Sequence, residues 1–213
     1  MLVSYLEKNY GYNEPIFINN IKIDGIKENA LRQNFNRLLK KGFLKRFDTG
    51  VYYLPKPSGV LKNAYLDSNK VVQKKYISDD TNIFGYITGL SFANQLGLTT
   101  QNPAIIEIVT NKETSKGRKI DIGNKKIIIK KAKQTITNDN YRILQFLDLM
   151  SNYEKWAECN DSTVKNILLK FLRKEKLKRD FLYKYIGNYP GIVAKRLIET
   201  GLIYEFAWGK GYV

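Results

Sequence analysis

Histidine is absent from this chain of 213 residues, and cysteine occurs only once, as Cys159. The lack of histidine excludes Ser-His and Cys-His nucleophile systems and removes the commonest general base. A single cysteine cannot form an intramolecular disulfide and, without histidine, leaves no plausible zinc site. The sequence therefore predicts no cofactor and no metal site, and we expect Cys159 to be a packed or idle thiol.

Long apolar runs are also missing. No stretch approaches the roughly 20 apolar residues that span a bilayer, and Glu7 and Lys8 interrupt the N-terminus before a signal core forms. We therefore expect a cytoplasmic protein. At this length, with 43% hydrophobic and 13% aromatic residues, the chain has enough apolar side chains for packed cores, in one large domain or two small ones.

Acidic residues are scarce: 20 Asp and Glu stand against 36 Lys and Arg, a formal charge of +16. Positions 1–57 hold ten basic and five acidic residues, positions 58–145 hold 14 and seven, and positions 146–213 hold 12 and eight. The excess is spread over the whole chain and predicts an anionic partner, either nucleic acid or an acidic protein.

The sequence also lacks the motifs of common phosphate chemistry. No Asp or Glu has a lysine two residues later, as the metal-binding strand of a restriction-type nuclease requires. Gly123 with Lys125 and Lys126 does not fit the GxxxxGK[ST] frame of a P-loop. We therefore expect a protein that is not an enzyme. The last alternative is a nuclease with scattered carboxylates, namely Asp79, Asp80, Glu107 and Asp121.

Residues 1–57 predict a winged helix-turn-helix DNA-binding domain. The pattern indicates helices over residues 2–8 and 14–20, a turn at Asp24-Gly25, and a third helix to Lys40 that Gly42 ends. Two strands, 43–47 and 51–54, flank Asp48-Thr49-Gly50 as the wing, and prolines at 55 and 57 end the unit.

The third helix has opposed faces. At about 100° per residue, Asn29, Gln33, Asn36 and Lys40 fall within about 60° of arc, and Leu31, Phe35 and Leu38 lie opposite. Amides pair with adenine edges and arginine pairs with guanine edges in the major groove, whereas other cations suit phosphates. The candidates for base contact are Asn29, Arg32, Gln33 and Asn36. The candidates for phosphate contact are Arg37, Lys40, Lys41, Lys45 and Arg46. A solvated helix face is the alternative interpretation.

After a linker at 58–80, with a helix expected around 62–74, residues 81–213 predict a second, α+β domain. We expect helical character over 84–96, closed by Gly97, and a strand over 104–110. A small antiparallel sheet with a hairpin, 119–122 and 126–131, follows around Gly123-Asn124. The remainder is helical, beginning at 140–152 and continuing through 163–172 and a basic run at 173–179. A second winged unit over 196–204 is a further alternative.

The hairpin carries the most basic patch, formed by Lys125, Lys126, Lys130, Lys131 and Lys133. Two interpretations remain open. The lysines either contact DNA or protect an exposed sheet edge from pairing with another chain.

The segment 32–55, RQNFNRLLKKGFLKRFDTGVYYLP, is followed by GLTTQ at 97–101, Thr110-Asn111 and YPGIV at 189–193. In these motifs and their order the chain resembles the AbiEi-type antitoxins, regulators of type IV toxin–antitoxin systems that are associated with phage defence. Asp48-Thr49 and Gly191 depart from the family pattern, in which basic residues and a second proline are frequent there.

The resemblance implies an antitoxin and autorepressor. Its N-terminal domain would bind inverted repeats of double-stranded DNA upstream of its own operon, and its C-terminal domain would counteract a nucleotidyltransferase-like toxin, with or without stable contact. For GLTTQ we favour a structural role, in which Gly97 takes a left-handed cap and the Thr hydroxyls satisfy backbone groups. The alternative function is a non-catalytic protein- or RNA-binding adaptor that uses the winged helix and basic surfaces for partner contacts.

Overall fold

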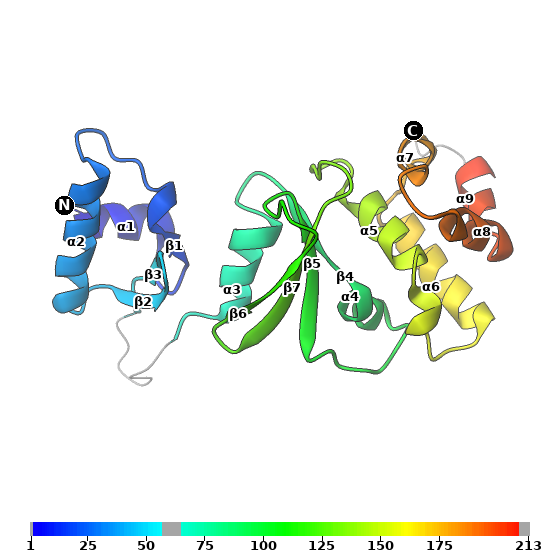
Figure 1. Cartoon of the computed structure of the whole chain (residues 1–213), viewed down its shortest axis with the longest axis horizontal. Helices are drawn as coiled ribbons and strands as arrows, with labels where there is room; N and C mark the ends of the chain where they lie inside the picture. Colours follow the sequence, from blue (N-terminus) through cyan, green and yellow to red (C-terminus); the bar gives the residue numbers. More distant parts are fainter. Residues whose placement is uncertain (1, 57–64, 209–213) are drawn as a thin grey trace. The chain divides into compact units, whose positions relative to one another are not determined.

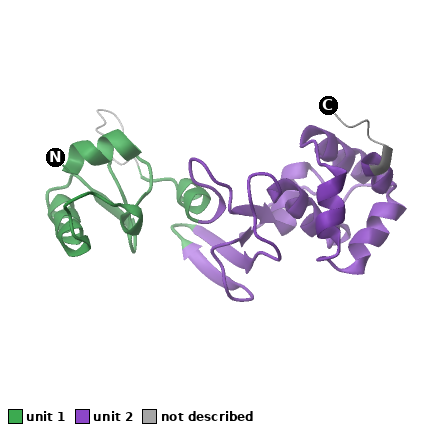
Figure 2. Cartoon of the chain, turned by 90° about the horizontal axis from the view of Figure 1, so that it is seen from above, with its two compact units in different colours: residues 1–75, 122–124 green, residues 76–121, 125–213 purple. Residues whose placement is uncertain are grey.

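The computed structural model describes residues 2–56 and 65–208, which form a mixed α/β protein with two small sheets (Figure 1). The chain divides into two compact units (Figure 2). Unit 1 consists of residues 1–75 with 122–124, and unit 2 of residues 76–121 with 125–213. Each unit is described separately below. Pro57 and positions 58–64 of the predicted linker and helix lie outside the described residues.

Unit 1 combines helices with a three-stranded antiparallel sheet. Its elements in chain order are α1 (Leu2–Tyr10), β1 (Ile16–Phe17), the 3-10 turn η1 (Ile18–Asn20), α2 (Glu28–Lys40), β2 (Lys45–Asp48), β3 (Val51–Tyr53) and α3 (Ser68–Val72). The strand order is β1-β3-β2, with Ile16 opposite Tyr52 and Lys45 opposite Tyr53. The predicted first and third helices and both strands of the hairpin are confirmed.

Apolar side chains of α1, β1, η1, α2 and β3 meet in one core, because α2 turns its apolar face toward the sheet. Phe35 is fully buried, and Leu31 and Leu44 are nearly so. Leu38, the third residue of the predicted apolar face, is partly buried against the same core. Gly42 has φ +76°, which confirms its predicted role at the end of the helix.

The second predicted helix, over residues 14–20, is wrong. Only residues 18–20 form a helical turn, and it is a single 3-10 turn, whereas Ile16 and Phe17 pair with β3 as a strand. Pro15 precedes them, and the apolar residues are consecutive rather than spaced at three and four. Their burial therefore comes from the sheet and not from a helix face.

Unit 2 contains a four-stranded sheet with the order β4-β5-β7-β6. Its strands are β4 (Gly85–Thr88), β5 (Ile105–Thr110), β6 (Arg118–Ile122) and β7 (Lys125–Lys131), and α4 (Gly89–Leu96) follows β4 directly. A π-helical segment, η2 (Gln73–Ile77), precedes the first strand. The predicted strands of the hairpin are confirmed, with slightly different ends.

The prediction of an antiparallel sheet here is wrong in part, because β5 and β7 are parallel, with Ile108 opposite Ile129. The β4–β5 pair is antiparallel, so the sheet is mixed. The helix predicted for 84–96 is also incorrect over its first residues: 85–88 form the edge strand β4, and only 89–96 are helical. A strand and a helix can both bury a short apolar run, so the spacing of the apolar residues does not distinguish the two here.

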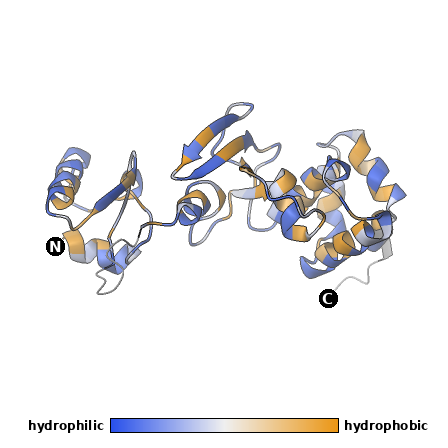
Figure 3. Ribbon diagram, turned by 90° about the horizontal axis from the view of Figure 1, so that it is seen from below, coloured by the Kyte–Doolittle hydropathy of each residue, from blue (hydrophilic) through white to orange (hydrophobic). Residues whose placement is uncertain are grey.

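Helices form the rest of unit 2. They are α5 (Tyr141–Met150), η3 (Tyr153–Lys155), α6 (Asp161–Lys174), α7 (Arg179–Ile186), α8 (Gly191–Glu199) and α9 (Leu202–Trp208). Helix α5 packs on the sheet, and the others pack on α5 and on one another. Hydrophobic and hydrophilic residues alternate along them (Figure 3). As predicted, α5 turns Ile143, Leu144, Leu147 and Met150 into the core, where they join Tyr86 and Val109 of the sheet.

The possible second winged unit at 196–204 is incorrect. After α8 and Gly201 the chain forms the helix α9 rather than a strand, and Leu202 and Phe206, one turn apart, are buried in the helical core. No helix among the described residues is long and apolar enough to cross a membrane.

Candidate nucleic-acid interface

The helix α2 presents one polar face to solvent. Asn29, Arg32, Gln33 and Asn36, the four predicted base-contacting residues, are all exposed on this helix. The buried residues Leu31 and Phe35 belong to the opposite face, which packs on the sheet of unit 1. The amphipathic spacing therefore positions the four polar side chains together and leaves their hydrogen-bonding groups accessible.

Of these four, only Arg32 has a side-chain partner that the structure records in unit 1. Its Nε and Nη2 donate to Oε1 of Glu28 at 3.2 and 2.6 Å, one helical turn earlier. The side chains of Arg32 and Glu28 are 54% and 71% exposed, so solvent reaches both charged groups. An ion pair with this exposure contributes little to stability. Its effect is to hold the guanidinium at the edge of the polar face.

The predicted phosphate-contacting residues follow along the chain from the end of α2 into the β2–β3 hairpin. Arg37, Lys40 and Lys41 are exposed near the end of the helix. Positive charge there also interacts favourably with the negative end of the helix dipole, which is a structural reason for these residues. The three cations make the C-terminal end of α2 strongly positive, whether they contact phosphates or only stabilise the helix end.

The two basic residues of β2 have additional contacts within unit 1. Lys45 is half-buried, and its Nζ lies 6.0 Å from the ring centroid of Tyr65. The exposed Arg46 donates to the backbone oxygen of Asp48 and to Oγ1 of Thr49, so it closes the turn of the hairpin. A register irregularity between Arg46 and Asp48 marks the same place. Sequence patterns identified both cations but not these partners.

The basic patch predicted on the hairpin of unit 2 is smaller than the sequence indicated. Lys130 forms an ion pair with Glu107, and Lys133 pairs with Asp148 with Nζ and Oδ1 3.0 Å apart. Lys125, Lys126 and Lys131 have no ion pair in the described part of the chain. Because β7 lies inside the sheet and β6 forms its edge, these lysines are not on an edge strand. The edge-protection interpretation therefore does not apply to them.

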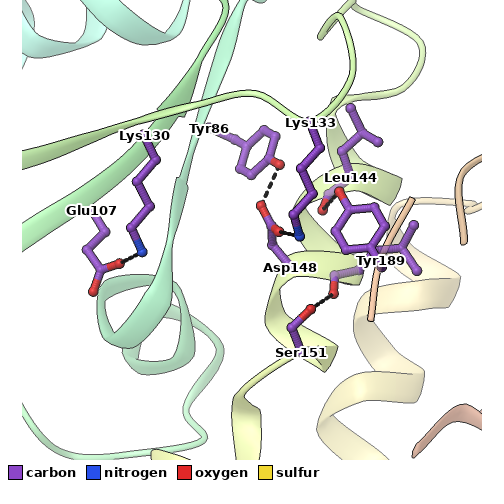
Figure 4. Close-up of polar contacts among 9 residues, drawn as sticks. Tyr86, Glu107, Lys130, Lys133, Leu144, Asp148, Ser151 and Tyr189 are labelled. Atoms are coloured by element: carbon purple, nitrogen blue, oxygen red, sulfur yellow. Dashed lines mark hydrogen bonds and ion pairs between the residues drawn. The ribbon is translucent and has the colours of Figure 1, made fainter. Parts of the chain in front are cut away.

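Asp148 of α5 is the centre of a polar cluster that connects separate parts of unit 2 (Figure 4). Tyr86 of β4 donates its hydroxyl to Oδ2 of Asp148 at 2.7 Å, while Lys133 donates to Oδ1. The Nζ of Lys133 also lies 3.9 Å from the ring centroid of Tyr189, whose hydroxyl donates to the backbone oxygen of Leu144. Burial and the negative charge of Asp148 raise the pKa of Tyr86 well above its ordinary value. The neutral phenol is therefore a fixed hydrogen-bond donor and stabilises the carboxylate.

The GLTTQ segment is held by one carboxylate that sequence reasoning missed. Glu158 accepts hydrogen bonds from the backbone N–H and the hydroxyl of Thr100, at 2.7 and 2.9 Å, and from Nε2 of Gln101 at 2.9 Å. These donors lower its pKa to about 2. The sequence separation of 58 residues explains why no local pattern indicates this contact.

The remaining residues of GLTTQ have the predicted structural contacts. Gly97 caps α4 with φ +79°, and Oγ1 of Thr99 accepts the backbone N–H of Gln101. Cys159, the residue after Glu158, is half-buried, and its Sγ lies 3.5 Å from the backbone oxygen of Leu98 in the same segment. The motif therefore stabilises the connection from α4 to β5.

Two of the four carboxylates considered for a nuclease, Asp79 and Glu107, have contacts of another kind. Asp79 accepts the backbone N–H groups of Thr81 and Asn82, which lower its pKa, and Glu107 pairs with Lys130. Among the described residues, no group of three or more His, Cys, Asp or Glu is arranged to hold a metal ion.

A family described only as of unknown function, DUF6088, matches residues 14–180. The matching region begins just before β1 and ends at the start of α7, so it includes α2, the β2–β3 hairpin and the contact between GLTTQ and Glu158. A comparison with curated proteins finds no match.

Proposed function

We propose, for a chain that belongs to the DUF6088 family of unknown function, that it is a DNA-binding antitoxin of a type IV toxin–antitoxin system that represses its own operon. In this proposal unit 1 is a winged helix. The order of α1, β1, η1, α2, β2 and β3, together with the strand order β1-β3-β2, supports this assignment. The 3-10 turn η1 stands in place of a second full helix.

The polar face of α2 is the observation on which the DNA-binding proposal depends most. Four side chains suited to base edges are exposed together, while the buried face packs into the core of unit 1. The cations at the end of α2 and on β2 suit the flanking phosphates. A helix that only covered a core would need no such concentration of amides and arginines.

The proposed role of unit 2 is to counteract a nucleotidyltransferase-like toxin. The resemblance of GLTTQ, Thr110-Asn111 and YPGIV to AbiEi-type antitoxins supports this role. In the structure Asn111 exchanges hydrogen bonds with the backbone of Ile136, and Tyr189 contacts α5, so the resembling motifs have structural contacts within unit 2. These contacts give the motifs a part in the framework of unit 2.

Repression is tested by a gel shift and footprint of the full chain on DNA from upstream of its own gene. Excess unrelated duplex competes, and the salt concentration is varied. A footprint over inverted repeats that survives the competitor at physiological salt supports the autorepressor. Binding that disappears with competitor leaves only the general attraction of a +16 chain for phosphate and favours the protein- or RNA-binding adaptor.

The antitoxin role has its own test. A neighbouring gene of nucleotidyltransferase type is expressed with and without the full chain, and growth is compared. Restored growth supports neutralisation, and a pull-down of the two proteins then separates neutralisation by contact from neutralisation without contact. Unchanged toxicity contradicts the antitoxin part of the proposal without affecting the DNA-binding part.

A further inference from the structure

The ion pair between Glu28 and Arg32 occupies one edge of the guanidinium and leaves another open. A guanidinium presents a side edge, formed by Nε and one Nη, and an end edge, formed by its two Nη atoms. Oε1 of Glu28 receives both donors of the side edge, Nε and Nη2. In unit 1 as described, Nη1 has no recorded partner, so the end edge remains available.

A free end edge is one of the two geometries in which arginine reads guanine. Two parallel N–H groups point at O6 and N7 of the base in the major groove. Unpaired arginine samples many rotamers and loses this freedom when it binds, which lowers affinity. A partner that holds the guanidinium before DNA arrives reduces that loss.

We infer that Glu28 is a positioning residue that fixes Arg32 for end-on recognition of one guanine. The inference rests on the proposed DNA-binding function and names the base that α2 reads at this position. Glu28 itself touches no DNA in this scheme. It acts through Arg32, and it also places a negative charge near the phosphates of any duplex that α2 approaches.

These two effects of Glu28 have opposite signs, which makes the inference testable. Removal of the carboxylate should raise affinity for unrelated DNA, because one repulsive charge is lost, by roughly two- to threefold. It should also reduce the preference for the specific site by about two- to threefold, since Arg32 is no longer held before it binds. Substitution of a residue with a purely structural role would lower the affinity for the specific site and the affinity for unrelated DNA together.

The substitution does not threaten folding. Glu28 is 71% exposed at the first position of a 13-residue helix, and its ion pair with Arg32 is solvated. Asp24→Asn is the matched control, because Asp24 is also exposed, lies four residues earlier and has no recorded side-chain partner in unit 1. It removes the same charge, so it should raise affinity for unrelated DNA similarly and keep the preference for the site.

The experiment begins with a duplex selected by the wild-type full chain from a random-sequence library, and a scrambled duplex of the same composition serves as unrelated DNA. Each guanine of the selected duplex is then replaced singly by 7-deazaguanine, which lacks the N7 acceptor but keeps its base pair. We expect one replacement to weaken wild-type binding about tenfold. The same replacement should have almost no effect on Arg32→Ala and a smaller effect on Glu28→Ala than on the wild type.

The outcomes separate the two proposals. If the library yields no enriched sequence, the sequence-specific DNA binding fails and the role of Glu28 fails with it. If a site is enriched and Glu28→Ala retains wild-type preference and wild-type sensitivity to 7-deazaguanine, the positioning role is overturned while DNA binding stands. If Asp24→Asn loses as much preference as Glu28→Ala, the effect is one of general charge, and the positioning role is again overturned.

Discussion

Phe35 of α2 and Tyr52 of β3 meet edge to face, with ring centroids 5.1 Å apart and an angle of 75° between the ring planes. Phe35 is fully buried, whereas Phe43, eight residues later, is 52% exposed. The Phe35–Tyr52 contact joins the proposed recognition helix to the central strand of its sheet. The contact therefore ties the polar face of α2 to the hairpin through the core of unit 1.

Truncation of Phe35 should destabilise unit 1 strongly. Phe35→Ala leaves a cavity between α2 and β3 and should lower the free energy of unfolding by about 3 to 5 kcal/mol. Chemical denaturation of the full chain measures this change. Phe43→Ala is the control and should change the free energy by less than about 0.5 kcal/mol, since the side chain is largely in solvent. Equal effects of the two substitutions would contradict the assigned core.

Substitutions on the polar face of α2 should divide into two classes. Gln33→Ala removes a candidate base contact and should reduce the preference for the specific site by about 1 to 3 kcal/mol. Its affinity for unrelated DNA and the salt dependence of binding should change little.

Lys41→Ala represents the second class, because Lys41 is an exposed candidate for phosphate contact. It should weaken binding to all duplexes alike and make the salt dependence shallower by about one phosphate contact. Both substitutions are measured by titration of the selected and scrambled duplexes at several salt concentrations. A uniform loss of affinity in both variants would show that α2 does not enter the major groove.

Glu158 should make the stability of unit 2 depend on pH in acid. Its pKa is lowered from 4.5 to about 2, so the carboxylate binds fewer protons in the folded chain than in the unfolded chain. The resulting stabilisation is complete above pH 4.5 and is lost as the pH falls toward 2. Thermal unfolding between pH 5 and pH 2 measures this loss.

Glu158→Gln should unfold more easily at neutral pH and show a weaker dependence on pH over the same range. Glu113 provides a second case, since hydrogen bonds from Ser115 and Arg118 lower its pKa to about 2 as well. Glu113→Gln should remove a separate part of the dependence of stability on pH between pH 5 and pH 2. If Glu158→Gln unfolds with the same pH dependence as the wild type, the hydrogen bonds of Glu158 to Thr100 and Gln101 do not persist in solution.

Gly97 should be far less tolerant of a side chain than Gly187. Gly97 has φ +79°, a conformation that alanine adopts only with strain, and Gly97→Ala should cost about 1 kcal/mol of stability. Gly187 ends α7 with φ −62°, and an added Cβ has nothing within 4 Å. Gly187→Ala should therefore be neutral or stabilise by up to about 1 kcal/mol. Urea denaturation of both variants tests this contrast, and equal values would contradict the left-handed cap.

The sequence was sufficient to predict elements whose pattern is local. The apolar spacing of Leu31, Phe35 and Leu38 identified α2 and its buried face, and Gly42 identified its end. The Gly123-Asn124 turn identified the β6–β7 hairpin. In each case a few neighbouring residues fix the backbone state, so no information from distant parts of the chain is required.

Elements that depend on distant partners were missed. Ile16 and Phe17 are strand residues only because Val51 and Tyr52 pair with them, and the parallel register of β5 and β7 has no signature in either strand alone. The same limit applies to the candidate site. The sequence identified Arg32 and Arg46 as candidate DNA contacts, but their contacts to Glu28 and Thr49 depend on side-chain rotamers.

The parallel pairing of β5 with β7 has a consequence during synthesis of the protein. Each residue of β5 pairs with a residue 21 positions later, so its partner leaves the ribosome only after β5 has emerged. At roughly 5 to 20 residues per second, the delay is about one to four seconds. For that time the segment Ile105–Thr110 can pair with β4 on one side but offers an open apolar edge on the other. The nascent chain is therefore most exposed to aggregation between the emergence of β5 and that of β7, and a chaperone that binds extended apolar segments would protect it then.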